Sequence, residues 1–241
     1  MSEVVVPTCK SFTHLFTKIR DQTTSPLDFR RYAKRLMTII CEEGLAELNP
    51  QDVTVTTPTG SEFAGKHVVT SDIVVVSIVR AADSMLECFS ELVPEAAVGK
   101  ILIQRNEETA EPQLYYAKLP SLEGKKVTTP QHVPSRLLLP LLLLATTIIL
   151  TLILALTCLY QVVLLDPMLA TGGSALCAVE VLLQKGAKIS DITFFNVVSC
   201  PEGLARFAKE APGLKVCAPN PNPNPNPNPN PNPNLGGNGL R

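Results

Sequence analysis

The sequence has no tryptophan, and its three histidines, His14, His67 and His132, lie far apart. Its seven cysteines form no C-x-x-C pair, so neither a zinc site nor a disulfide framework is indicated. The formal net charge of −1 gives no electrostatic basis for binding along DNA or RNA. The first residues lack the basic and apolar regions of a secretory signal. These absences favour a reduced, cytoplasmic protein that does not hold a metal directly and has no nucleic-acid partner.

Two stretches depart from an ordinary globular composition. Residues 137–160 carry no charge and are dominated by leucine, isoleucine and threonine. Residues 219–234 are eight consecutive Pro-Asn pairs. Proline removes backbone donors and favours extended chain, so we expect this tail to be disordered. The remainder of the chain is typical of a mixed α/β protein.

Apolar runs without alternation predict strands that are buried on both faces, which is typical of a parallel sheet covered by helices. Four such runs occur: Asp72–Val79, Ile101–Gln104, Val162–Leu165 and Ile192–Val198. Helical patterns occur around and between them, at Ser25–Leu48, Ser84–Leu92, Ala175–Gln184 and Glu202–Glu210. The alternation predicts a doubly wound α/β fold with a mainly parallel sheet, interrupted by the apolar stretch. Ligands of such folds bind beyond the carboxyl ends of the strands.

The segment Val162–Leu183 reads as a strand, a loop and a helix. Its loop contains Asp166, and Thr171-Gly172-Gly173-Ser174 opens the helix. Glycines let backbone N–H groups crowd one point, and the helix N-terminus favours an anion, so this loop suits a phosphate. Asp166 can accept hydrogen bonds from two ribose hydroxyls. A glycine-rich turn without a ligand is the alternative, and no lysine follows the glycines as in a Walker P-loop.

The sequence DPMLATGGSA, residues 166–175, resembles the phosphoribosyl-diphosphate (PRPP) loop of uracil phosphoribosyltransferases, which are type I phosphoribosyltransferases. Further segments resemble this family in the same order. They are IRDQTTSPLDFRRYAKRL, VTTPTG (Val55–Gly60), VSIVRAADSM with Arg80, and VGKILIQRNEETAEPQLYYAKLP with Arg105 and Lys118. The resemblance covers most of residues 20–126 and 162–216.

The resemblance implies a pentosyltransferase of pyrimidine salvage that joins uracil to PRPP, with release of UMP and pyrophosphate. Positive charge would build on the ribose and negative charge on the leaving group, which arginines would neutralise. Asp166 is the implied catalytic residue. The implied PRPP-binding residues are Arg80, Arg105, Lys118, Asp166, Pro167, Met168, Leu169, Ala170, Thr171, Gly172, Gly173 and Ser174.

Mg²⁺ would arrive with the diphosphate, held mostly by water and substrate oxygens. The resemblance also implies a homo-oligomer and, as in some relatives, regulation by GTP. Residues 110–118 would form an arm that closes over PRPP; a solvated hairpin is the alternative. Two departures stand out: Ala82 replaces a glycine, where a Cβ predicts backbone strain, and Asn106 replaces an aspartate.

The resemblance divides the chain into four parts. Residues 1–127 and 162–218 are the two parts of the phosphoribosyltransferase domain, and residues 219–241 are the tail. Residues 128–161 are an insert, whose apolar stretch from 137 to 160 is long enough for a single transmembrane helix. We favour a translated intron, because Val127 is encoded by GT-starting codons and the insert ends in codons that can spell a pyrimidine-rich tract and CAG. A membrane span would separate Arg80 and Arg105 from the Asp166 loop.

The segment that holds uracil in the family, of the type Y-x-V-P-G-x-G-D, is not found after Val216. No uracil-binding residue is therefore assigned, and uracil transfer is predicted to be impaired or lost. Three readings stay open: an active uracil phosphoribosyltransferase, a PRPP-binding protein without turnover, and a single-pass membrane protein that contains the domain.

Overall fold

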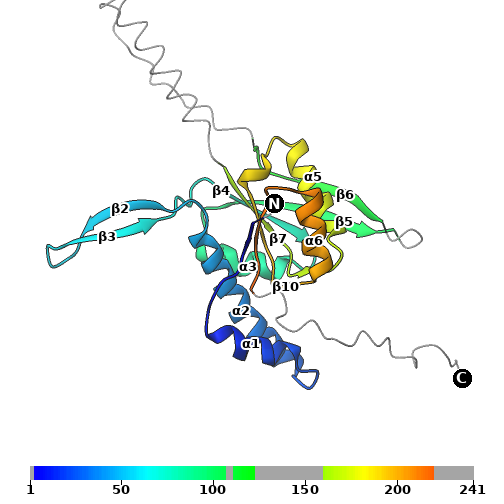
Figure 1. The fold of residues 1–241 in the computed structure, drawn as a ribbon, viewed down its shortest axis with the longest axis horizontal. Coiled ribbons are helices and arrows are strands. Elements are labelled where there is room, and N and C mark those ends of the chain that lie inside the picture. The colour runs from blue at the N-terminus through cyan, green and yellow to red at the C-terminus, as the bar shows by residue number, and fades with distance from the viewer. Residues whose placement is uncertain (1–2, 107–110, 123–159, 220–241) are drawn as a thin grey trace, which may run out of the picture.

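A computed structural model describes residues 3–106, 111–122 and 160–219 (Figure 1). Its main sheet has seven strands in the order β1-β11-β9-β7-β4-β5-β6, parallel except for the β5–β6 pair. The strands of this sheet are β1 (Glu3–Val5), β4 (Ile73–Val79), β5 (Ala97–Arg105), β6 (Pro112–Lys118), β7 (Gln161–Leu165), β9 (Ile192–Phe195) and β11 (Lys215–Cys217). The predicted α/β class with a mainly parallel sheet is confirmed.

Helices cover both faces of the sheet (Figure 1). The helices are α1 (Ser11–Arg20), α2 (Pro26–Ala46), α3 (Asp83–Leu92), α5 (Gly173–Gln184), α6 (Pro201–Glu210) and the short 3₁₀ helix η1 (Ile189–Asp191). A hairpin of β2 (Gln51–Thr56) and β3 (Glu62–His67) projects away from the sheet, and β8 (Met168–Leu169) pairs with β10 (Val198–Ser199).

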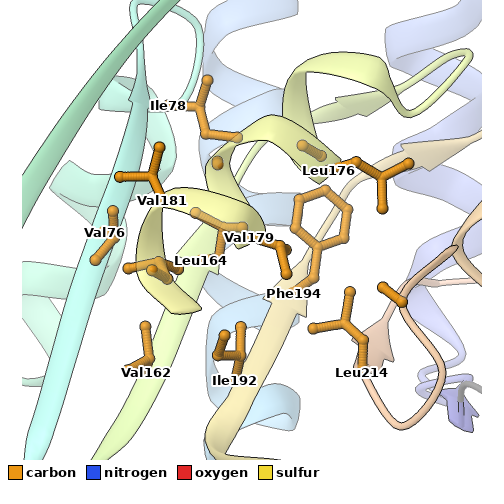
Figure 2. Close-up of a cluster of buried hydrophobic side chains, with 14 of the residues drawn as sticks. Val76, Ile78, Val162, Leu164, Leu176, Val179, Val181, Ile192, Phe194 and Leu214 are labelled. Carbon is orange, nitrogen blue, oxygen red and sulfur yellow. The ribbon is translucent and has the colours of Figure 1, made fainter. Parts of the chain in front are cut away.

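Alternate residues of each central strand point to opposite faces of the sheet. Val162 and Leu164 pack with Phe194 beneath α5, in the cluster of Figure 2. Val163 and Leu165 pack instead in the core beneath α1, α2 and α3. Both faces are therefore buried, which explains why these strands read as continuous apolar runs.

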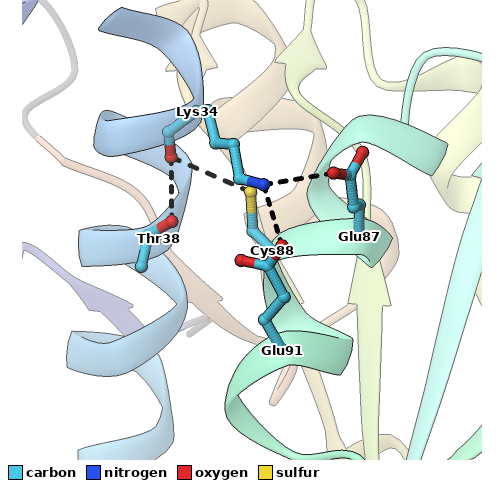
Figure 3. A network of polar contacts seen from close by, with 5 residues as sticks. All are labelled: Lys34, Thr38, Glu87, Cys88 and Glu91. Carbon is cyan, nitrogen blue, oxygen red and sulfur yellow. Dashed lines mark hydrogen bonds and ion pairs between the residues drawn. The ribbon is translucent and has the colours of Figure 1, made fainter. Parts of the chain in front are cut away.

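Helix α2 starts as its sequence predicts. The Ser25 hydroxyl accepts a hydrogen bond from the Asp28 N–H at 3.1 Å, and Pro26 occupies the first helical position. The helix is joined to α3 by Lys34, whose ammonium donates to Glu87 at 3.1 Å and Glu91 at 2.8 Å (Figure 3).

The last predicted strand is shorter than expected. Instead of running to Val198, β9 ends at Phe195. The N–H groups of Val197 and Val198 both donate to the Pro167 carbonyl, at 3.2 and 3.0 Å, so the chain leaves the sheet and pairs with the loop after β7. Strand β7 begins at Gln161, which pairs with Ile73, one residue before the predicted strand Val162–Leu165.

Strands from both sides of residues 123–159 lie in one sheet. Five residue pairs join β4 to β7, from Ile73 with Gln161 to Ser77 with Leu165. No helix within the described ranges is long and apolar enough to cross a membrane. The predicted apolar span, apart from Tyr160, and the Pro-Asn repeat beyond residue 219 fall outside those ranges.

Candidate active site

The carboxyl ends of β7, β4 and β5 meet at one edge of the sheet. Leu165 pairs with Ser77, and Val79 pairs with Leu102, so Asp166 and Arg80 directly follow their strands at this edge, and Arg105 is the last residue of β5 there. Parallel strands present their carboxyl ends together, which makes this edge the expected place for a ligand. The sheet therefore gathers residues that are far apart in the chain.

The loop between β7 and α5 encloses a cavity of about 180 Å³. Gly172 caps the helix with φ of +78°, a left-handed conformation that side chains rarely adopt. The first turn of α5 follows directly, and the N–H groups of a first helical turn have no acceptor within the helix. The cavity is lined by Arg105, Asp166, Met168, Leu169, Ala170, Gly172, Gly173, Ser174 and Ala175.

Arg105 reaches this loop from β5. Its Nη2 donates to the Thr171 hydroxyl at 3.2 Å, although 66 positions separate the two residues. Strand β6 also approaches the loop, because a Cβ on Gly173 would lie 3.6 Å from the Pro112 ring. A guanidinium and a helix N-terminus thus face the same small space, an arrangement suited to a phosphorylated ligand.

Asp166 is a partly buried carboxylate at the end of β7. Burial raises its pKa to about 6, and a hydrogen bond from the Met168 N–H to Oδ1, at 3.2 Å, opposes this rise. The raised pKa reflects desolvation of the ionised form without a compensating cation. Such a carboxylate suits a role as acceptor for hydroxyl groups of a bound sugar.

Arg80 is exposed at the end of β4, outside the lining of the cavity described above. The turn that carries it is held by Asp83, whose Oδ1 accepts from the Ser77 hydroxyl at 2.8 Å and from the Lys100 ammonium at 3.1 Å. Ala82 has φ of −70° and ψ of −12°. The predicted strain at Ala82 is therefore wrong, because a right-handed helical conformation accommodates a Cβ.

Lys118 is placed differently from the other predicted residues. The antiparallel β5–β6 register pairs it with Lys100, whereas Arg105 pairs with Pro112. Five residues of strand, roughly 17 Å, therefore separate Lys118 from the Arg105 end. Within the described residues, 112–118 form the second strand of a hairpin, and the Asn106 N–H donates to the Glu111 carbonyl at 2.9 Å.

Comparisons with known proteins agree with this geometry. The family model for uracil phosphoribosyltransferase matches residues 6–236. The chain belongs to the uracil phosphoribosyltransferase family. It is 40% identical over 213 residues to the uracil phosphoribosyltransferase of Dictyostelium discoideum, covering 88% of this chain and 82% of the relative.

Other relatives give a similar result. Uracil phosphoribosyltransferase 1 of Schizosaccharomyces pombe is 38% identical over 202 residues, covering 84% of this chain and 76% of the relative. The solved structure of the AQ2163 protein from Aquifex aeolicus matches with a TM-score of 0.63 and 28% identity, covering 89% of this chain and 85% of that one. The predicted family and its pentosyltransferase activity in pyrimidine salvage are confirmed.

The loop after β7 is supported by residues that the sequence did not single out. Asn196 donates from Nδ2 to the Asp166 carbonyl at 2.9 Å. Gly203 lies so close that a Cβ there would be 2.4 Å from the Ala170 carbonyl oxygen. Arg206 donates from Nη1 to the Thr171 carbonyl at 3.4 Å. Asn196 interrupts the apolar run ITFFNVV, and a polar residue inside such a run was a usable signal, whereas no local pattern distinguishes Arg206.

Proposed function

We propose that the loop after β7, together with Arg105, binds PRPP for transfer of its ribose phosphate to uracil, which yields UMP and pyrophosphate. The observation that carries this proposal is the contact between Arg105 and Thr171. It brings a cation from one half of the domain against the glycine-lined loop of the other half. The family's reaction requires both groups to face one diphosphorylated sugar.

Each part of the site has a chemical role in this proposal. The loop from Thr171 to Ser174 and the N-terminus of α5 hold a phosphate group, since backbone N–H groups and the helix dipole favour an anion. Asp166 accepts from the ribose hydroxyls and counters positive charge that develops on the sugar. Arg105, and Arg80 on the neighbouring strand, neutralise the leaving pyrophosphate.

The remaining predicted residues have less direct roles. Met168, Leu169 and Ala170 line the cavity, and the Met168 N–H donates to the Asp166 carboxylate. Pro167 lies outside this lining, and its carbonyl accepts from the Val197 and Val198 N–H groups. Lys118 lies on the far part of the hairpin, so its proposed contact with PRPP requires the hairpin to move. We therefore rest the proposal on Arg105 and the loop.

The donor set of the cavity suits Mg²⁺ that enters with the substrate. Among the described residues that line the cavity, Asp166 supplies the carboxylate, and the other lining groups are a guanidinium, apolar side chains, glycines and a hydroxyl. Mg²⁺ is commonly held by one or two carboxylates, water and substrate phosphates. When bound, the ion would neutralise charge on the diphosphate while Arg105 and the loop orient it.

The predicted partners are kept as parts of this proposal. They are uracil and PRPP as substrates, other copies of the chain in a homo-oligomer, and GTP as an effector, in a cytoplasmic enzyme. Light scattering with and without GTP measures the assembly. A particle of one-chain mass in both conditions would contradict the homo-oligomer. A rate of UMP formation that GTP leaves unchanged would contradict the role of GTP as an effector.

A second candidate function is PRPP binding without turnover. It is favoured by one observation, the lack of a Y-x-V-P-G-x-G-D segment after Val216. Calorimetry with Mg²⁺ and PRPP, run beside an assay for UMP formed from labelled uracil, separates the two functions. UMP formation supports the transferase, whereas binding without UMP supports the second candidate.

The binding experiment has a matched pair of variants. Arg105→Gln removes the guanidinium that faces the loop, and Arg30→Gln removes an exposed guanidinium from α2. A hydrogen bond to a charged group contributes about 1.5–3 kcal/mol, so Arg105→Gln should weaken PRPP binding by about 10- to 100-fold. Arg30→Gln should bind as the unmodified chain does. Absence of magnesium-dependent PRPP binding by the unmodified chain would overturn the proposal.

A further inference from the structure

A buried side-chain pair lies behind the loop, at the point where β9 ends. Asn196 is fully buried and Ser199 is 9% exposed. The Ser199 hydroxyl donates to Asn196 Oδ1 at 2.5 Å, and Asn196 Nδ2 donates to the Asp166 carbonyl oxygen at 2.9 Å. The pair therefore ends on the backbone of the residue that carries the carboxylate of the site.

The two hydrogen bonds set the orientation of the Asn196 amide. Its oxygen faces a hydroxyl that can donate, and its nitrogen faces a carbonyl that can only accept. A rotated amide would turn its oxygen toward the Asp166 carbonyl oxygen, leaving both acceptors without a donor in a buried place. Ser199 thereby fixes which group of Asn196 reaches Asp166.

Backbone contacts extend this support along the loop. Met168 and Leu169 pair with Val198 and Ser199 in the small β8–β10 sheet. The Cys200 N–H donates to the Leu169 carbonyl at 2.7 Å. The Asp166 N–H donates to the Phe195 carbonyl at 3.2 Å. Residues 195–200 are therefore hydrogen-bonded along the loop, and the Asn196–Ser199 pair supplies the side-chain hydrogen bond to Asp166.

We propose that Asn196 and Ser199 are positioning residues for PRPP, which act by holding the Asp166 carbonyl and so the direction of the Asp166 side chain. This inference rests on the proposed function of the loop. It assigns to the pair a contribution to substrate affinity beyond its contribution to stability, because the direction of a carboxylate decides whether it meets the ribose hydroxyls.

The test compares two variants of the full chain. Ser199→Ala leaves the Asn196 oxygen buried without its donor, so both the unfolding midpoint and PRPP affinity should fall, the affinity by about tenfold. Asn196→Leu combined with Ser199→Ala removes the Asn196 oxygen together with its donor, but it leaves the Asp166 carbonyl oxygen without the Asn196 donor. The double variant should be at least as stable as Ser199→Ala, because each leaves one acceptor unpaired and leucine adds apolar burial, and its PRPP binding should be about tenfold weaker than that of the unmodified chain, because the Asp166 carbonyl has lost its donor.

Calorimetry with Mg²⁺ and PRPP measures affinity, and denaturant unfolding measures stability. Ser190→Ala, which removes an exposed hydroxyl on η1, is the control and should change neither. A double variant that binds PRPP as tightly as the unmodified chain would overturn the positioning role. If Ser199→Ala does not fold, the double variant still decides. No PRPP binding by the unmodified chain would instead count against the proposed function of the loop.

Discussion

Replacing Gly203 by alanine should destabilise this protein, contrary to the usual effect of alanine in a helix. Gly203 lies in the first turn of α6, and its missing side chain lets the helix approach the loop after β7. A Cβ at this position would lie 2.4 Å from the Ala170 carbonyl oxygen and 3.0 Å from Leu169 Cγ. The nearest atom belongs to the backbone, so it cannot rotate away as a flexible side chain does.

The two opposing contributions can be compared in size. Alanine in place of glycine adds up to about 1 kcal/mol of helix stability. Forcing an extra carbon into a packed contact costs typically about 1–3 kcal/mol, and a contact near 2.4 Å belongs at the upper end. We therefore expect Gly203→Ala to lower the free energy of unfolding by about 1–2 kcal/mol, which for a chain of this length corresponds to a Tm lower by roughly 2–8 °C.

Denaturant unfolding of Gly203→Ala, beside PRPP calorimetry, checks this prediction. Ala205→Gly, at an exposed position of the same helix, is the matched control, and should cost about 0.5–1 kcal/mol without affecting PRPP binding. The Gly203 variant should in addition bind PRPP more weakly, because displacement of α6 moves Ala170. A Gly203→Ala protein that is more stable than the original chain, with unchanged PRPP affinity, would refute the close packing.

Three further predictions concern Asp166, Gly172 and Lys34. The pKa of Asp166 is raised to about 6, so its favourable contribution to folding is complete below pH 4 and is lost as pH rises through 6. Asp166→Asn should therefore be more stable than the original chain by about 1–3 kcal/mol at pH 7.5, and equally stable at pH 4. Gly172→Ala should lower stability by about 1–2 kcal/mol and weaken PRPP binding, because φ is +78° and Phe207 would lie 3.2 Å from the Cβ. Lys34→Met should reduce stability only slightly, because the ion pairs of Lys34 with Glu87 and Glu91 are exposed to solvent, and this loss of stability should vanish in high salt.

Unfolding titrations measure all three, at two pH values for Asp166 and at two salt concentrations for Lys34. A gain for Asp166→Asn that is the same at pH 4 and pH 7.5 would contradict the raised pKa. Gly186→Ala is a control for Gly172, because its φ is also positive, at +95°, but nothing lies within 4 Å of a Cβ there. Equal losses for the two glycine variants would show that contact with Phe207 adds nothing. A large, salt-independent loss for Lys34→Met would contradict the solvent exposure of the two ion pairs that Lys34 makes (drawn in Figure 3).

Local sequence patterns were sufficient to predict most of the helices and strands and to identify the family. Apolar runs predicted β4, β5 and β7, because strands buried on both faces lack alternation, and Ser25-Pro26 marked the start of α2. DPMLATGGSA also placed Asp166 at a strand end and the glycines at a helix start. These features depend on side-chain period and turn chemistry over a few residues, which the chain carries in itself.

Tertiary structure alone decided which of these residues meet. The contact between Arg105 and Thr171, and the separation of Lys118 from it, follow from strand order and register, which no local pattern encodes. The strain expected at Ala82 was wrong, since a residue's φ and ψ depend on the fold around it. Asn196 similarly acquires its role only because the chain after β9 leaves the sheet to pair with the loop after β7. Packing between segments distant in sequence therefore built the site that local chemistry had only suggested.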